Sequence, residues 1–124
     1  PASDAIVICS FGDASLNHAS AQSAFNTADW VAYQKLPIPI LFLCEDNGFG
    51  ISVRSPAGWV KRKFLIHPGI KYFGADGLDI EASYLAAKEA VEYCRLRRKP
   101  AFLHLKLILK KESLHILILH TCKV

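Results

Sequence analysis

The sequence predicts an α/β fold with a mostly parallel sheet and flanking helices, and three observations support this prediction. Apolar runs at residues 5–11 and 40–44 are typical of strands covered on both faces. Shorter strand patterns follow at residues 71–75 and 101–105, and helical patterns separate the strands within each half of the chain. The length of 124 residues, with 52% hydrophobic and 21% charged residues, suits one globular domain.

Both predicted helices have an apolar stripe and recognisable ends. The first helix ends before Pro37, and the second begins after the capping residue Asp79 and ends before Pro100. The first stripe consists of Ala21, Phe25, Ala28, Ala32 and Leu36, and the second of Tyr84, Ala87, Val91 and Cys94. Residues 53–69 contain several prolines and glycines, and we expect an irregular loop there.

The composition argues against several classes of partner. No apolar run approaches the roughly 20 residues of a membrane helix, so no membrane partner is expected. The net charge of +4 comes largely from basic residues near the end of the second helix, where they face solvent, so no nucleic acid is expected. The cysteines lack zinc-finger spacing and are predicted to be buried free thiols in a reducing compartment. They are Cys9, Cys44, Cys94 and Cys122.

Two polar loops follow the first two predicted strands. Gly12-Asp13-Ala14-Ser15 ends the first strand, and residues 45–50 end the second. Neighbouring parallel strands bring such loops to one edge of a sheet, where ligands bind. The carboxylate of Asp13 and the amide oxygen of Asn47 are hard ligands suited to Mg²⁺, and small residues before a helix let backbone amides approach a phosphate. These loops predict a magnesium-bridged diphosphate, although ordinary turn or cap roles explain each residue singly. Rossmann and Walker glycine patterns are absent.

A longer stretch carries a family resemblance. The sequence GDASLNHASAQSAFNTADWVAYQKLPIPILFLCEDNGFGIS resembles the thiamine diphosphate motif, which runs from Gly-Asp-Gly through a helix and a strand to Asn-Asn. The stretch most resembles the sequence of the alpha-type chain of the decarboxylating dehydrogenase component of 2-oxo acid dehydrogenase complexes. Phe25-Asn26, Lys35-Leu36-Pro37 and residues 44–52 match that order, and residues 74–106 resemble the next stretch. The resemblance implies an incomplete thiamine diphosphate-binding fold over residues 1–106.

The resemblance implies roles for particular residues. Asp13, the side-chain oxygen of Asn47 and the backbone carbonyl of Phe49 would bind Mg²⁺. The cofactor-binding set would comprise Gly12, Asp13, Ala14, Ser15, Glu45, Asn47 and Phe49. No catalytic residue is assigned, because the family takes its activating glutamate from a beta-type chain. Thiamine diphosphate supplies the chemistry that decarboxylates a 2-oxo acid, and the acyl group passes to a lipoyl-bearing acyltransferase.

The sequence departs from the family pattern in several places. Ala14 replaces the second glycine of the motif, and Asp46 replaces the first asparagine. Residues 107–124 do not resemble the family, and we expect them to be an atypical, non-native tail. The preceding family segments, with further cofactor contacts, have no counterpart here.

Three hypotheses about function follow. The leading one is a fragment of a 2-oxo acid dehydrogenase subunit, inactive alone and located in the cytoplasm or the mitochondrial matrix. The second is a thiamine diphosphate module of a transketolase-like or synthase-type enzyme. The third is a non-catalytic fold remnant or interaction module. Titration with Mg²⁺ and thiamine diphosphate separates the first two from the third.

Overall fold

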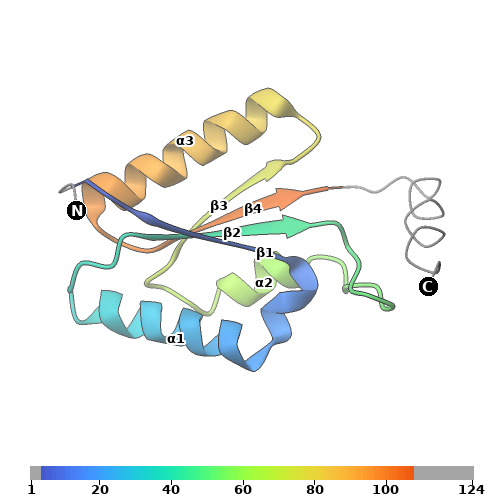
Figure 1. Ribbon diagram of the computed structural model, residues 1–124, viewed down its shortest axis with the longest axis horizontal. Helices are drawn as coiled ribbons and strands as arrows, with labels where there is room; N and C mark the ends of the chain where they lie inside the picture. The colour runs from blue at the N-terminus through green and yellow to red at the C-terminus, as the bar shows by residue number, and fades with distance from the viewer. Residues whose placement is uncertain (1–3, 108–124) are drawn as a thin grey trace, which may run out of the picture.

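A computed structural model describes residues 4–107 of the chain and confirms the α/β prediction. Its sheet has four parallel strands in the order β1-β2-β4-β3. The strands are β1 (Val7–Gly12), β2 (Ile40–Asp46), β3 (Lys71–Asp76) and β4 (Ala101–Lys106). All four carboxyl ends therefore lie at one edge of the sheet (Figure 1).

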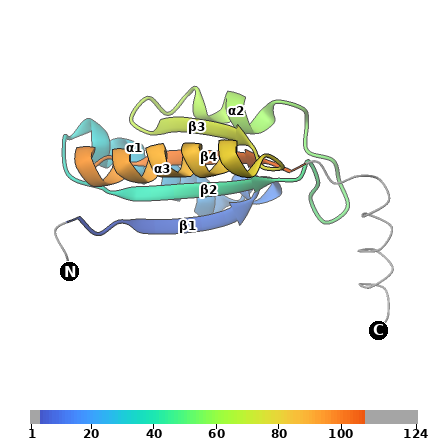
Figure 2. The same cartoon turned by 90° about the horizontal axis from the view of Figure 1, so that it is seen from above.

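Helices cover the two faces of the sheet unequally. Helices α1 (Ala19–Tyr33) and α2 (Trp59–Phe64) lie on one face, and α3 (Ile80–Arg97) lies on the other (Figure 1). Helix α3 packs chiefly against β3 and β4, and β1 forms an edge of the sheet (Figure 2). Asp79 caps α3 as expected, since its carboxylate accepts a hydrogen bond of 3.0 Å from the Ala82 amide. No described helix is long and apolar enough to cross a membrane.

Strand alternation divides the apolar side chains into two cores. Phe42 and Phe102 face α1 and α2, where they join Phe25 and Phe64 in the larger core. Their strand neighbours face α3 and build the smaller core with Ala90 and Cys94; these neighbours are Leu41, Ala101 and Leu103. Because β2 and β4 are buried on both faces, they read as continuous apolar runs.

The prediction of an irregular loop at residues 53–69 was wrong in its centre. Residues 59–64 form α2, which begins after Gly58 in the left-handed conformation, with φ of 74°. Val60 and Phe64 lie one helical turn apart and are both buried against the sheet. The helix has only six residues, three of them basic, so its periodicity is too short to stand out between the flanking prolines and glycines.

Three burial predictions were also wrong. Helix α1 ends at Tyr33, so Leu36 lies beyond it and is exposed. Tyr84 is exposed as well, because the buried stripe of α3 runs through Ala90 and Cys94 instead. The expectation that both faces of the strand at residues 5–11 are covered was wrong too: Val7, Ile8 and Cys9 are exposed, because β1 is an edge strand. Cys122 and the predicted tail, from residue 108 onward, lie outside the described residues.

The cysteines should differ sharply in reactivity. Burial raises the pKa of the Cys94 thiol to about 11, and burial together with Asp46, Asp13 and Glu45 raises that of Cys44 further still. Brief treatment of the native chain with iodoacetamide should therefore modify Cys9, with Cys44 and Cys94 modified only after unfolding in urea. Peptide mass spectrometry gives the measurement, and equal labelling of Cys9 and Cys44 in the native chain would contradict the described burial.

Candidate functional site

The two predicted polar loops lie side by side at the carboxyl edge of the sheet. Gly12 and Glu45 are register partners at the ends of β1 and β2. The loops also touch further on, because a Cβ added to Gly50 would lie 3.2 Å from the Cβ of Ala14. Residue 14 therefore accepts a methyl group here, where the family motif has glycine, and Gly50 leaves room for it.

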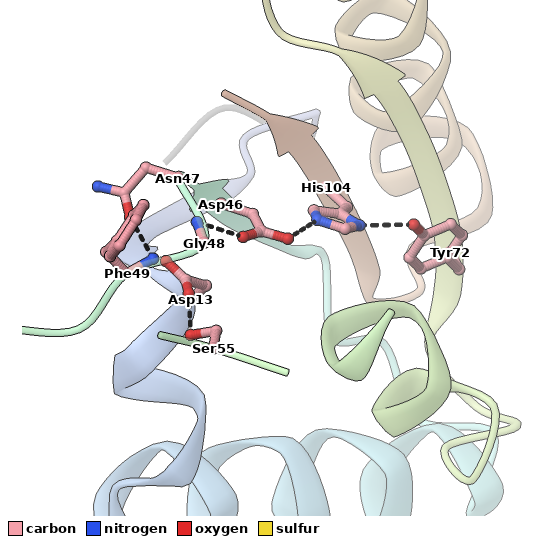
Figure 3. Close-up of polar contacts among 8 residues, drawn as sticks. All are labelled: Asp13, Asp46, Asn47, Gly48, Phe49, Ser55, Tyr72 and His104. Atoms are coloured by element: carbon pink, nitrogen blue, oxygen red, sulfur yellow. Dashed lines mark hydrogen bonds and ion pairs between the residues drawn. The ribbon is translucent and has the colours of Figure 1, made fainter. Parts of the chain in front are cut away.

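Asp13 is a buried carboxylate, with only 1% of its surface exposed. Its Oδ2 accepts a hydrogen bond from the Ser55 hydroxyl (Figure 3). Within residues 4–107, the two side-chain ion pairs join His67 to Asp29 and His104 to Asp46, so no described cation pairs with Asp13. A buried carboxylate without a cation is costly, and a divalent ion would relieve that cost. This donor therefore fits the Mg²⁺ that the resemblance implies.

The loop after β2 consists of two successive side-chain-capped turns. Asp46 Oδ1 accepts a hydrogen bond of 3.0 Å from the Gly48 amide, and Asn47 Oδ1 accepts one of 2.9 Å from the Phe49 amide (Figure 3). Gly48 has a φ of 74°, a conformation that favours glycine. The Asn47 oxygen keeps a second lone pair with which it could bind a metal ion.

The sequence predicted that a helix begins directly after the first loop, but α1 begins later. Residues Asp13–Asn17 form a short 3-10 helix, and α1 follows after His18, whose ring accepts a hydrogen bond from the Ser20 amide. Ala14 and Ser15 thus lie in the 3-10 turn with exposed side chains. The positive end of α1 is displaced from the residues expected to contact a diphosphate.

A hydrogen-bonded chain beside these loops was not predicted from the sequence. His104 Nε2 lies 2.7 Å from Asp46 Oδ2, and His104 Nδ1 lies 2.7 Å from the Tyr72 hydroxyl (Figure 3). The only sequence signal was a histidine that interrupts an apolar strand. Tyr72 and His104 also line a cavity of about 400 Å³ at the ends of β3 and β4, together with Lys61 and Lys106. No three Asp, Glu, His or Cys side chains gather as a metal cluster among the described residues.

The surroundings of Tyr72 and His104 fix which of their atoms carry the hydrogens. Burial lowers the pKa of His104, and this effect outweighs the opposing influence of Asp46. Burial also raises the pKa of Tyr72 to about 12, with Cys44 and Asp46 adding to the shift. A neutral His104 therefore donates from Nε2 to the Asp46 carboxylate, and Tyr72 donates its hydroxyl hydrogen to Nδ1.

The buried His104 should make stability depend on pH. Its pKa in the folded state lies below the ordinary value of 6.5, so the unfolded chain binds a proton more readily. The contribution of His104 to the free energy of unfolding is therefore highest above pH 6.5, and it falls progressively as the pH drops below 6.5. Urea unfolding at about pH 7.5 and about pH 5.5 should show a smaller pH difference for His104→Gln than for the wild-type chain. Equal differences in the two chains would contradict the assigned environment.

Comparison with known proteins identifies the family of the chain. The family model described as "Dehydrogenase E1 component" matches residues 2–107. A 2-oxoisovalerate dehydrogenase subunit alpha from Mus musculus is 35% identical over 88 residues, covering 68% of this chain and 19% of the relative. A pyruvate dehydrogenase E1 component subunit alpha from Rhizobium meliloti is 30% identical over 105 residues, covering 82% of this chain and 29% of the relative. The chain thus spans less than a third of these relatives, and it belongs to the dehydrogenase E1 component family.

Proposed function

We propose that this chain anchors Mg²⁺ and thiamine diphosphate within the decarboxylating subunit of a 2-oxo acid dehydrogenase. Asp13 supplies a carboxylate to the metal, Asn47 its side-chain oxygen and Phe49 its backbone carbonyl. The backbone amides of the first loop hold the diphosphate. The proposed cofactor-binding residues are Gly12, Asp13, Ala14, Ser15, Glu45, Asn47 and Phe49.

The observation that carries this proposal is the burial of Asp13 beside the Asn47 loop without a described cation. One carboxylate and two neutral oxygens form an incomplete set for Mg²⁺, which usually completes its octahedron with phosphate and water. A diphosphate would therefore bind with the metal rather than alone.

The bound cofactor supplies the electron sink for decarboxylation of a 2-oxo acid. This chain's residues bind and orient its diphosphate end, with the metal held at the buried carboxylate of Asp13. A beta-type chain supplies the remaining catalytic groups, and a lipoyl-bearing acyltransferase receives the acyl unit. Because the named relatives include a mitochondrial protein and a bacterial one, we place the reaction in the mitochondrial matrix or the cytoplasm.

The family match favours this function over a transketolase-like or synthase-type module. A non-catalytic remnant of the same fold differs in one measurable respect, because it would not bind the cofactor. We also expect the isolated chain to lack decarboxylase activity, since it spans less than a third of its relatives. A measurable rate of 2-oxo acid decarboxylation by the chain alone would contradict that part of the proposal.

Calorimetric titration of the wild-type chain tests the proposal directly. Thiamine diphosphate should release heat only when Mg²⁺ is present, and chelation of the metal should abolish the signal. Thiamine without its diphosphate serves as the matched ligand and should not bind in a metal-dependent way. Absence of metal-dependent heat would favour the non-catalytic remnant.

A further inference from the structure

We propose that Tyr72 and His104 are positioning residues that hold the metal-binding loop in place through Asp46. The inference rests on the proposed function, since it concerns the loop that presents Asn47 and Phe49. Neither Tyr72 nor His104 belongs to the proposed cofactor-binding set. Both come from strands on the far side of β2 from Asp13.

The two oxygens of the Asp46 carboxylate accept hydrogen bonds from different partners. Oδ2 accepts from His104 Nε2 at 2.7 Å, and Oδ1 accepts from the Gly48 amide at 3.0 Å. A carboxylate is rigid, so holding one oxygen fixes the direction of the other. The place of the Gly48 amide, and with it the turn that contains Asn47, thus depends on His104.

The orientation of the His104 ring is itself held by its neighbours. The residue is 1% exposed, and its Nδ1 lies 2.7 Å from the Tyr72 hydroxyl, on the side of the ring opposite Asp46. Tyr72 stacks on the buried Phe102, with ring centroids 6.1 Å apart and planes at 20°. Two directed hydrogen bonds and a packed ring leave His104 one orientation from which to donate to Asp46.

Further hydrogen bonds connect Gly48 to Asp13, the proposed carboxylate ligand of the metal. The Gly48 carbonyl accepts a hydrogen bond of 2.9 Å from the Ser55 amide. The Ser55 hydroxyl in turn donates to Asp13 Oδ2. An unbroken path of hydrogen bonds therefore joins Tyr72 on β3 to Asp13 at the end of β1. Figure 3 shows the hydrogen bonds from Tyr72 to Gly48 and the one from Ser55 to Asp13. The Ser55–Gly48 backbone bond joins these two parts, so the same path holds both candidate metal loops.

The test is a double-mutant cycle on the full chain. Tyr72→Phe removes one hydroxyl and keeps the ring, and it should raise the Kd for thiamine diphosphate, at saturating Mg²⁺, about fivefold. The same substitution in an Asp46→Ala background should change that Kd by less than about twofold, because the path is already broken. Tyr93→Phe is the matched control, since Tyr93 packs on Phe73 in the α3 core, and it should leave the Kd unchanged.

Amide hydrogen exchange provides a readout that does not depend on the cofactor. Tyr72→Phe should speed exchange at the Gly48 amide and leave the core amide of Leu103 unchanged, which separates loop release from general loss of stability. Wild-type binding combined with equal Tyr72→Phe effects in both backgrounds would overturn the positioning role and leave the proposed function intact. Absence of binding by the wild-type chain would reject the cofactor site, and unchanged Gly48 exchange would reject the loop tether separately.

Discussion

Asp13→Asn should abolish the Mg²⁺-dependent binding of thiamine diphosphate while leaving the unloaded chain at least as stable as wild type. The buried carboxylate lies near the Glu45–Asp46 end of β2, with no described cation beside it. Asparagine has nearly the same shape and can still accept from the Ser55 hydroxyl, but it carries no charge. Removing one member of a buried charge pair costs about 3–5 kcal/mol, which corresponds to a loss of affinity of about 100-fold or more.

The measurement combines calorimetric titration with urea unfolding in the absence of metal. Asp76→Asn is the matched control, because Asp76 ends β3 and caps a similar turn, accepting 3.0 Å from the Leu78 amide. It should leave cofactor binding within about twofold of wild type. An Asp13→Asn chain that still bound the cofactor with magnesium would exclude Asp13 as the ligand. A less stable unloaded variant would show instead that the carboxylate serves the fold.

Phe102→Ala should lower the free energy of unfolding by about 3–5 kcal/mol, a large part of the stability of a domain of this size. Phe102 is fully buried at the centre of the larger core, and its ring lies 3.5 Å, centroid to centroid, from that of Phe64. It also contacts Phe25 edge-on and supports Tyr72. Truncation leaves a cavity between β4 and α2 that rigid neighbouring strands cannot close.

Urea unfolding followed by circular dichroism gives this measurement. Tyr33→Ala is the control for loss of an aromatic ring, since Tyr33 is 87% exposed at the end of α1 and should cost less than about 0.5 kcal/mol. Similar losses for both variants would contradict the central place of Phe102. Because Tyr72 rests on Phe102, the Phe102→Ala chain should also exchange its Gly48 amide faster.

The main strands and the two long helices could be predicted from local patterns. Strands buried on both faces, such as β2, require continuous apolar runs, and Asp79 and Pro100 signal the ends of α3 chemically. Helix α2 could not be predicted, because its six residues are stabilised by the burial of Val60 and Phe64 rather than by their own pattern. The exposure of Cys9 depends on the edge position of β1, which is a property of strand order.

The candidate site also contains residues that the sequence predicts and residues that only the tertiary structure reveals. Asp13 and Asn47 were found because residues that follow neighbouring parallel strands must share an edge. Ser55 and Tyr72 could not be predicted as site residues, since they lie 42 and 59 positions from Asp13 and no motif marks either of them. Asp46 departs from the motif, and its hydrogen bond with His104 gives that departure a structural reason.

The sequence by itself determined the class of fold, the family and the two loops, because strand periodicity, turn residues and motif order are properties of neighbouring positions. Only the tertiary structure decided which strand lies at the edge, which side chains are buried and how Tyr72, His104 and Asp46 join across β3, β4 and β2. These depend on contacts between residues distant along the chain, whose free energies arise from packing and desolvation and leave no periodic trace in the sequence.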